Sequence, residues 1–456
     1  MRQHPGDRQM RLAGVGGSQN GLDPRGEHGT GSERRGGITH YGPVWRFRPP
    51  LATGGRDMAG GEGPRVASLS PAMPRDSAPP PPAHPGRHMA LLGAVFAAIG
   101  AVQPFLPAYL AERGLSAAQV SLVLALGAGI RILAGPLGGR LADALGNPRL
   151  LMVLFSLAGA LAAAGFVPAA GLAGFLLAQL ALNAAMAPLT PLADAVCLAA
   201  ARRGGLEYGR LRAAGSVTYM AMAVLAGWMA GHFGLGLLPG LMAAALLAVT
   251  AAALALPRPP PPATRPGFQG GVGAVLRLPG FARLLLLSGL IQSSHATYYG
   301  FSTIHWSAAG HAPSVIGLLW AEAVVGEVAL FVMGHRLARR LGPAGMAMLA
   351  ASAGLLRWSL MAATTWLPAL LLIQLLHALS FGAQHLAAMQ LILRLVPPPL
   401  AGTAQALHSA LGVGLLMGLM TLVSGPAYAA WGGGVFLVMA GLCALALPLA
   451  LRLRQD

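Results

Sequence analysis

From residue 89 almost to the C-terminal end, the chain alternates between apolar stretches of about 20 residues and short polar segments. A helix of ~20 residues is ~30 Å long, which matches the hydrocarbon thickness of a bilayer. The pattern therefore predicts twelve transmembrane helices. The first six cover residues 89–111, 117–137, 149–168, 171–195, 213–231 and 235–256. The second six cover residues 281–304, 313–333, 345–364, 367–392, 401–424 and 430–451.

Two polar segments divide the chain into regions. Residues 1–88 are rich in Gly, Pro and Arg and show no apolar periodicity, which predicts a disordered segment that forms a cytoplasmic tail. The alternative is a mis-assigned start, with the true start at Met89, Met58 or Met73. Residues 257–280 contain a run of four prolines and predict a central cytoplasmic loop. Residues 89–256 and 281–456 are then two six-helix halves, and the predicted class is an all-α membrane protein.

The arginines are distributed unevenly over the predicted loops. Sixteen lie on one side: Arg140, Arg149, Arg202, Arg203, Arg210, Arg212, Arg258, Arg265, Arg277, Arg283, Arg336, Arg339, Arg340, Arg394, Arg452 and Arg454. The opposite loops carry only Arg113. By the positive-inside rule, the arginine-rich side and both termini are predicted to be cytoplasmic. We expect a multi-pass protein of a bacterial inner membrane.

Composition agrees with a membrane protein and argues against nucleic-acid binding. Hydrophobic residues make up 55% of the chain and charged residues 10%, against about 25% charged in a typical soluble domain. The net charge of +17 comes from arginines in residues 1–88 and in short loops rather than from one basic patch. Cys197 and Cys443 stand alone in apolar runs, so we expect neither a disulfide nor a metal site.

The two halves are related by an offset of 196 residues. Residues 140–146 read RLADALG and residues 336–342 read RLARRLG. The same offset places Phe105 on Phe301 and Gly114 on Gly310 without a gap. Two parallel six-helix repeats joined by a cytoplasmic loop are the architecture of the major facilitator fold.

The loop after the second predicted helix supports the same fold. Its glycines, Asp143 and Arg149 resemble the signature found between helices 2 and 3 of the major facilitator superfamily. The resemblance implies a gating role for four residues: Gly139, Asp143, Gly146 and Arg149. The alternative is an ordinary charged loop, because Ala144 replaces the usual basic residue.

Within the superfamily, several stretches look like the phenylpropionate permease family. They are Gln103–Pro107, Pro191–Asp194, Tyr208–Arg212, Ser294–Ser302 with His305–Trp306, and His377–Gly382 with His385–Ala388. The resemblance runs over roughly residues 90–450. It implies proton-coupled uptake of a small aromatic or other carboxylate, driven by the proton gradient and without a cofactor.

Charged side chains inside the predicted spans indicate a functional or structural role, because inserting each one at a helix centre costs about 2.5–3.5 kcal/mol. Five stand out: Arg131, Asp194, Glu322, Glu327 and Arg357. The repeat offset maps Arg131 onto Glu327, so the two are expected at comparable depth in equivalent helices.

One hypothesis gives this pair a transport role. Arg131 binds the substrate carboxylate with its planar fork, and Glu327 or Glu322 carries the coupling proton. The alternative is an inert ion pair that fixes helix packing. For Arg357 we expect a structural role, and for Asp194 a pairing with Arg210 or Arg212.

Polar residues also recur at helical spacing in the predicted cavity helices 1, 4, 7 and 10. In lipid such stripes turn inward, either to line an aqueous path or to bond neighbouring helices. Together with Arg131, the predicted substrate-binding residues are Gln103, Asn183, His295, Tyr299, His377, Phe381 and Gln384.

Other functions find less support in the sequence. The chain has no GxxxxGK[ST], HExxH or paired-cysteine motif, so we expect no enzyme. A drug/proton antiporter and a sugar or nucleoside proton symporter are the alternatives within the fold, and a membrane receptor or sensor is the alternative outside transport. The expected partners are a small-molecule substrate and the lipid bilayer, with no nucleic acid, and the expected state is a monomer.

Overall fold

A computed structural model describes residues 84–202, 207–257 and 271–452. Residues Ser77–Asp456 form one compact unit, and its described part consists of helices and turns without a strand. The predicted segment before residue 84 lies outside the described residues, as do residues 258–270 of the predicted central loop.

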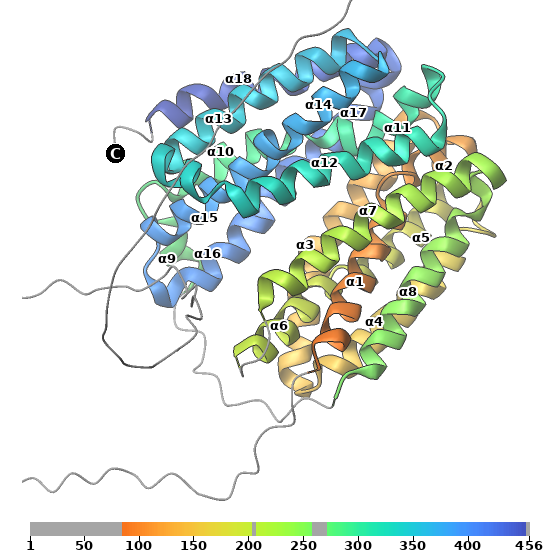
Figure 1. Cartoon of the computed structure of the whole chain (residues 1–456), viewed down its shortest axis with the longest axis horizontal. Coiled ribbons are helices and arrows are strands. Elements are labelled where there is room, and N and C mark those ends of the chain that lie inside the picture. Colours follow the sequence, from red (N-terminus) through yellow and green to blue (C-terminus); the bar gives the residue numbers. More distant parts are fainter. Residues whose placement is uncertain (1–83, 203–206, 258–270, 453–456) are drawn as a thin grey trace, which may run out of the picture. The chain divides into compact units, whose positions relative to one another are not determined.

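The N-terminal half runs from orange to green in Figure 1. Its helices are α1 (Pro85–Val102), α2 (Leu106–Glu112), α3 (Ala117–Leu145), α4 (Pro148–Ala164), α5 (Gly171–Met186), α6 (Leu189–Arg202), α7 (Tyr208–Phe233), η1 (Leu235–Leu237) and α8 (Leu238–Ala255). Helix α1 begins at Pro85, four residues before the predicted boundary, because proline is favoured in the first turn of a helix.

The C-terminal half runs from teal to dark blue (Figure 1). Its first helices are α9 (Val272–Leu276), α10 (Phe281–Ser293), α11 (Ala296–Ala308), α12 (Pro313–Met333), α13 (His335–Ala363) and α14 (Leu367–His377). They are followed by η2 (Ala378–Gly382), α15 (Ala383–Leu395), η3 (Pro398–Leu400), α16 (Ala401–Leu407), η4 (His408–Leu415), α17 (Leu416–Trp431), η5 (Gly432–Val435) and α18 (Phe436–Arg452). Helix α9 is a short turn of helix where the sequence predicts a loop.

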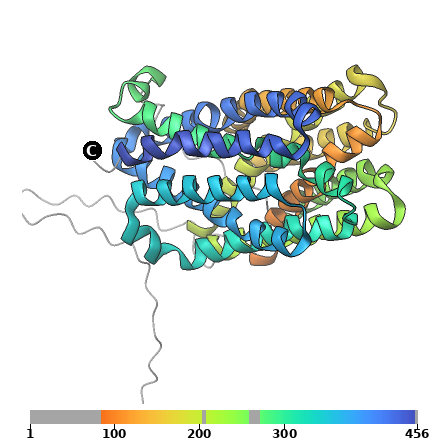
Figure 2. The ribbon, with the colours of Figure 1, turned by 90° about the horizontal axis from the view of Figure 1, so that it is seen from above.

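The helices account for twelve membrane passes. Nine stretches of the described residues are long and apolar enough to span a bilayer. The last of them, Ala401–Arg452, contains two passes, since a left-handed Gly432 turns the chain between α17 and α18. Helix α4 and the pair α10–α11 add one pass each. Figure 2 shows the helices of both halves running along a common direction.

The predicted internal repeat is confirmed by the backbone at its glycines. Gly114 and Gly310 both have φ of 89°, and Gly146 and Gly342 have φ of 60° and 63°. A positive φ is strained for any residue with a Cβ, so a matched pair of such turns needs glycine in both halves. The turn at Gly114 thus has its counterpart at Gly310, whereas Gly146 and Gly342 share a positive φ but differ in ψ, 13° against −179°.

Several spans are interrupted along their length, and three of the interruptions adjoin residues that line the cavity described below. Pro104 lies between α1 and α2, where it removes a backbone donor from the helical ladder. Ser294 and His295 lie between α10 and α11, and their side chains bond back to carbonyl groups of the preceding turn. Between α14 and α15, η2 is a π-helical segment, a feature frequently found at functional sites.

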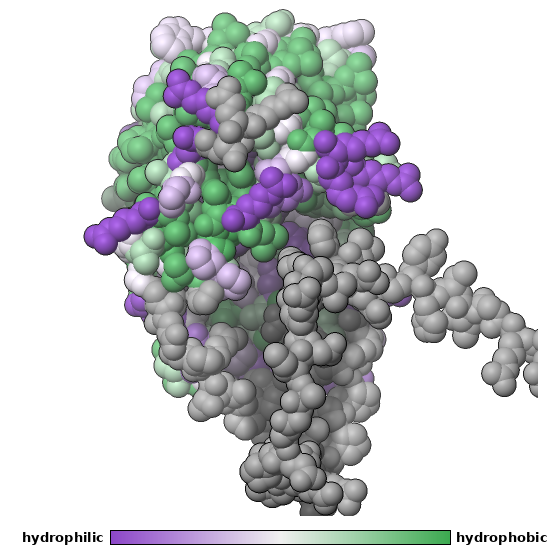
Figure 3. All heavy atoms as spheres, turned by 90° about the vertical axis from the view of Figure 1, so that its left-hand side faces the viewer, coloured by the Kyte–Doolittle hydropathy of each residue, from purple (hydrophilic) through white to green (hydrophobic). Residues whose placement is uncertain are grey.

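The surface of the unit suits a bilayer. Large apolar side chains such as Leu161, Leu372 and Leu393 are exposed on its outside. Arginines that the sequence places on the cytoplasmic side lie at one end, for example Arg140 near the end of α3 and Arg452 in the last turn of α18. Figure 3 views this end and shows hydrophilic side chains gathered beside hydrophobic flanks.

The two halves approach each other most closely at the end opposite the arginines, through glycines. A Cβ on Gly227 of α7 would lie 2.5 Å from the carbonyl oxygen of Pro313, at the start of α12. A Cβ on Gly317 would lie 2.6 Å from the carbonyl oxygen of Ala223. Gly425 of α17 is packed in the same way against Ala117 in the first turn of α3. Only glycine permits contacts this close, so these crossings close that end of the bundle.

Candidate functional site

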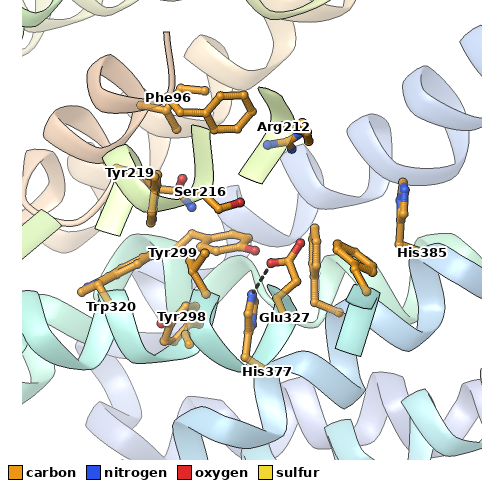
Figure 4. A pocket seen from close by; sticks show the side chains of 16 residues that line it. Phe96, Arg212, Ser216, Tyr219, Tyr298, Tyr299, Trp320, Glu327, His377 and His385 are labelled. Carbon is orange, nitrogen blue, oxygen red and sulfur yellow. Dashed lines mark ion pairs between the residues drawn. The ribbon is translucent and has the colours of Figure 1, made fainter. Parts of the chain in front are cut away.

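A cavity of about 290 Å³ lies between the two halves and receives side chains from both. The N-terminal half contributes Phe96, Ile99, Gln103, Arg212, Ser216 and Tyr219. The C-terminal half contributes Tyr298, Tyr299, Trp320, Ala323, Val324, Glu327, Phe331, His377, Phe381 and His385. In Figure 4 the labelled side chains of the two halves face each other across this space.

Aromatic rings form much of the cavity wall. The rings of Tyr299 and Trp320 are stacked with centroids 6.1 Å apart, and Tyr298 lies 4.7 Å from Trp320. On the neighbouring helix, His377 and Phe381 are stacked at 5.2 Å. Such rings offer flat apolar faces to a planar ligand, with the Tyr hydroxyls and the His nitrogens as polar contacts.

Glu327 supplies the carboxylate of the site, and His377 faces it. Their nearest atoms, Oε2 and Nε2, are 3.8 Å apart (Figure 4). The Glu327 side chain is 20% exposed and the His377 side chain 6%. The carboxylate therefore borders the cavity while remaining largely removed from water.

Arg212 is the cation that lines the cavity. It lies in the first turns of α7, and its guanidinium carbon is 4.0 Å from the centre of the Phe96 ring. Figure 4 shows Arg212 on the side of the N-terminal half, across from Glu327. A cation and an acid thus face the same space from different halves.

Arg357 of α13 lies behind the cavity wall and is completely buried. Its Nη1 is 2.9 Å from His377 Nδ1 and its Nη2 donates to Gln374 Oε1 at 2.9 Å. Its guanidinium also lies against two rings, 4.6 Å from Tyr298 and 4.4 Å from Trp358. We expected a structural pairing or an inward-facing packing role for Arg357, and the residues that it contacts include the cavity-lining His377 and Tyr298.

Comparison with known proteins decides the family. The MFS_1 like family matches residues 91–438. The chain belongs to the MFS_1 like family. The superfamily resemblance read from the loop and the repeat is thereby confirmed.

Two curated relatives and two solved structures are transporters. The chain is 34% identical to the Probable 3-phenylpropionic acid transporter of Escherichia coli (strain K12) over 354 residues, 76% of this chain and 91% of the relative. It is 31% identical to the Maltose permease of Geobacillus stearothermophilus over 357 residues, covering 77% and 89%. The nucleoside transporter NupG has a TM-score of 0.72 at 16% identity, covering 81% of this chain and 98% of NupG. A bacterial homolog of the human lysosomal transporter Spinster, inward-facing and occupied, has a TM-score of 0.64 at 14% identity, covering 81% and 96%.

These likenesses make this MFS_1 like protein a multi-pass membrane transporter and not an enzyme. At 16% and 14% identity the solved structures establish the fold alone. Within the described residues, no group of three or more His, Cys, Asp or Glu side chains is arranged to hold a metal ion.

Five of the predicted site residues of this MFS_1 like protein line the cavity: Gln103, Tyr299, Glu327, His377 and Phe381. His295 lies behind them, stacked on Tyr299 at 6.0 Å, with Nε2 3.3 Å from Ser380 Oγ. Gln384 is buried and donates to Ser288 Oγ at 2.9 Å. Glu322 is not among the lining residues, and its Oε2 is buried without a hydrogen-bond partner.

Arg131 and Asn183 lie outside the cavity lining and contact each other. Arg131 Nη1 donates to Asn183 Oδ1 at 3.5 Å, because α3 turns this side chain towards α5. The direct pairing of Arg131 with Glu327 is not formed in this structure, where Glu327 faces His377 instead. Equivalent positions in the repeat therefore do not bring these two charges together.

Asp194 takes a different partner from those we expected. It accepts a hydrogen bond from the Tyr208 hydroxyl at 2.9 Å. Arg210 pairs with Glu207 at 2.8 Å on the exposed first turn of α7.

The predicted gating loop lies at the arginine-rich end, and none of its four residues lines the cavity. Gly146 ends α3 in the left-handed conformation, and Arg149 Nη2 donates to the carbonyl oxygen of Leu254 at 2.6 Å. Gly139 leaves open space where a Cβ would stand, and Asp143 is engaged in an interaction. Gly139 and Asp143 lie within α3, which runs to Leu145, eight residues beyond the predicted end of the second helix. Gly146 and Asn147 join α3 to α4, and Arg149 bonds this corner to α8.

Eleven of the sixteen lining residues were not among the predicted site residues, and Arg212 and Trp320 are the two of them that bear most on substrate binding. Arg212 was assigned to a predicted cytoplasmic loop together with other arginines. It also belongs to Tyr208–Arg212, one of the stretches that resemble the phenylpropionate permease family. Trp320 precedes the acids of α12, and its Nε1 donates to Thr303 Oγ1 at 3.0 Å.

Proposed function

We propose that this transporter is a proton symporter that takes up small aromatic carboxylates by alternating access. The observation that carries the proposal is the cavity itself. It combines aromatic walls, a cation from one half and an acid from the other within about 290 Å³. Drug-sized ligand pockets occupy about 300–1,000 Å³, so this volume favours a small substrate.

Substrate recognition follows from the lining residues. Tyr299 and Trp320 stack on a planar ring, and Arg212 binds the carboxylate with its planar fork of donors. Gln103 borders the same space and offers an amide to the carboxylate or the ring substituents. We place the anion at Arg212 rather than Arg131, because only Arg212 lines the cavity.

Coupling follows from the two charges that share the cavity. In the empty carrier the Glu327 carboxylate balances the charge of Arg212 across the space. A proton that binds Glu327 removes that balance, and the substrate carboxylate then restores it at Arg212. Burying either charge alone is costly, so proton and substrate cross together.

One of the two named curated relatives supports this substrate class. The 34% identical relative is named a probable 3-phenylpropionic acid transporter, and its name describes an aromatic carboxylate. The arginine distribution supports an inner-membrane location with both termini in the cytoplasm. We further propose a monomer, since one chain supplies both walls of the cavity.

The test is uptake of labelled 3-phenylpropionate into proteoliposomes under an imposed inward proton gradient. We expect accumulation above equilibrium that a protonophore abolishes. Labelled maltose and uridine, added separately under the same gradient, serve as substrate controls. Uptake that ignores the gradient, or that is absent, contradicts the proposal.

A second candidate is sugar/proton symport. It is favoured by the 31% identity to a maltose permease and by the stacked rings, which also suit the apolar face of a sugar. Gradient-driven maltose uptake that 3-phenylpropionate does not inhibit would select this function instead.

A further inference from the structure

The contact between Arg357 and His377 fixes the protonation state of the imidazole. Arg357 Nη1 and His377 Nδ1 are 2.9 Å apart in a fully buried site. A guanidinium has five N–H donors and no acceptor, and it stays charged in proteins. His377 Nδ1 must therefore accept, which leaves the single ring proton of a neutral imidazole on Nε2.

The proton on Nε2 points to the acid of the cavity. His377 Nε2 is the atom that faces Glu327 Oε2 at 3.8 Å. Arg357, His377 and Glu327 thus form a directed line from α13 through α14 to α12. In this line each donor faces an acceptor, and the last acceptor borders the cavity.

Arg357 is itself held in a single orientation. Besides His377, it donates to Gln374 Oε1 at 2.9 Å and to Ser380 Oγ at 3.4 Å. Gln374 is fixed in turn, since its Nε2 donates to the Tyr298 hydroxyl at 2.9 Å. Within the described residues, Arg357 forms no ion pair with a carboxylate, so its hydrogen bonds go to neutral groups.

We infer that Arg357 is a positioning residue that keeps His377 neutral with its proton on Nε2, so that Glu327 alone carries the coupling proton. The inference rests on the proposed function and assigns the proton to one of two adjacent groups. A second proton on His377 would leave two cations 2.9 Å apart with no acceptor between them. His377 instead donates to the Glu327 carboxylate whenever that group has released its proton.

The other groups around His377 do not offer an alternative proton site. The His295 ring lies 5.4 Å away, and its Nδ1 faces the carbonyl oxygens of Ile291 and Gln292, so that nitrogen bears the proton. Its Nε2 faces Ser380 Oγ rather than the cavity. The Tyr298 ring, 6.1 Å from His377, receives its hydroxyl contact from Gln374.

The direct test is nitrogen NMR of histidine-labelled protein in lipid, with the His377 signal assigned by its loss in His377→Gln. We expect the pattern of a neutral ring protonated on Nε2, unchanged as the pH falls through the range in which transport is proton-dependent. A His377 ring protonated on Nδ1, or one that gains a second proton in that range, overturns the inference. This result does not depend on which substrate is carried.

Variants at Arg357 test the functional consequence. In Arg357→Met, His377 is free to titrate, and we expect the pH profile of uptake to gain a second step that the added His377→Gln removes. Arg357→Lys keeps a buried donor and should retain the single-step profile, with uptake reduced by about tenfold from the lost hydrogen bonds. A Met variant with lower uptake but an unchanged profile shows a merely structural role and contradicts the inference. If the wild type shows no proton dependence at all, the proposed function fails, while the NMR result still decides the tautomer.

Discussion

Glu327 and His377 face each other from α12 and α14 with Oε2 and Nε2 3.8 Å apart at the edge of the cavity. This distance exceeds that of a hydrogen bond by roughly 1 Å. A small movement of either helix therefore forms or breaks the bond. The pair lies in the C-terminal half, whereas Arg212 approaches from the N-terminal half, so a relative movement of the halves changes the surroundings of the acid.

We predict that Glu327→Gln separates substrate transport from the proton gradient. The amide keeps the size and polarity of a protonated carboxyl but cannot release a proton. Gradient-driven accumulation of 3-phenylpropionate should be lost, while exchange of labelled for unlabelled substrate across the membrane continues. Glu322→Gln, on the same helix but outside the cavity lining, is the matched control and should keep accumulation. Accumulation that survives in Glu327→Gln removes the carrier role.

Arginines at two positions give a second matched comparison. Arg212→Gln should raise the KM for 3-phenylpropionate by roughly tenfold to a hundredfold, the effect of losing a charged hydrogen bond. Arg131→Gln should change the KM by less than about twofold, because Arg131 is an exposed side chain that contacts Asn183 outside the cavity. The measurement is initial uptake rate against substrate concentration. Equal effects of the two substitutions would argue against Arg212 as the anion site.

The architecture could largely be predicted from the sequence because the bilayer imposes a simple rule on it. Apolar stretches of spanning length, arginines on one side and the 196-residue offset all follow from local pattern. The matched φ angles of Gly114 and Gly310 show how closely that offset describes the backbone. The breaks at Pro104 and at Ser294–His295 depend on proline and on side chains that bond to carbonyl groups, and only the first was visible as a pattern.

The site could be predicted only in part, since it depends on which way each helix is rotated. Four predicted residues reach the cavity from helical segments with several polar residues: Tyr299, Glu327, His377 and Phe381. Arg131 was expected opposite Glu327 from sequence equivalence, but equivalent helices present different faces to their neighbours. For Arg357 we expected a structural role, and its bond to His377 joins residues of two different helices. The spacing of residues along one helix cannot predict a contact between two helices.

The glycine crossings predict a conformational effect. Gly227→Val places a side chain against the carbonyl oxygen of Pro313, where a Cβ would lie only 2.5 Å away. Closure of the end opposite the arginines should weaken, and a cysteine introduced as Gln103→Cys should react faster with a thiol reagent added outside. The native Cys197 and Cys443 are buried and should contribute little background. Gly231→Val is the control one turn along α7, where the atom nearest to an added Cβ is 4.0 Å away. Equal rates of cysteine modification in the two variants would show that the crossing at Gly227 does not close this end.

A polar contact within the N-terminal half should contribute modestly to stability. Ser156 of α4 and Thr250 of α8 are hydrogen-bonded at 2.7 Å between their hydroxyl oxygens, in a buried site. A double-mutant cycle of Ser156→Ala and Thr250→Val, followed by unfolding in mixed micelles, should give a coupling energy of about 0.6 kcal/mol and at most about 1.7 kcal/mol. No coupling would mean that each hydroxyl is satisfied by its own helix. Uptake by the variants should remain near that of the wild type, because neither residue lines the cavity.

Proton movement driven by substrate entry shows whether Glu327 couples the two fluxes. Proteoliposomes that contain a pH-sensitive dye, with no initial pH difference, are given 3-phenylpropionate on the outside. Because substrate and proton bind together, the wild type should acidify the lumen as the substrate enters, and Glu327→Gln should not. If labelled substrate enters through the wild type while the luminal pH stays constant, transport is not coupled to protons, and Glu327 does not carry a coupling proton.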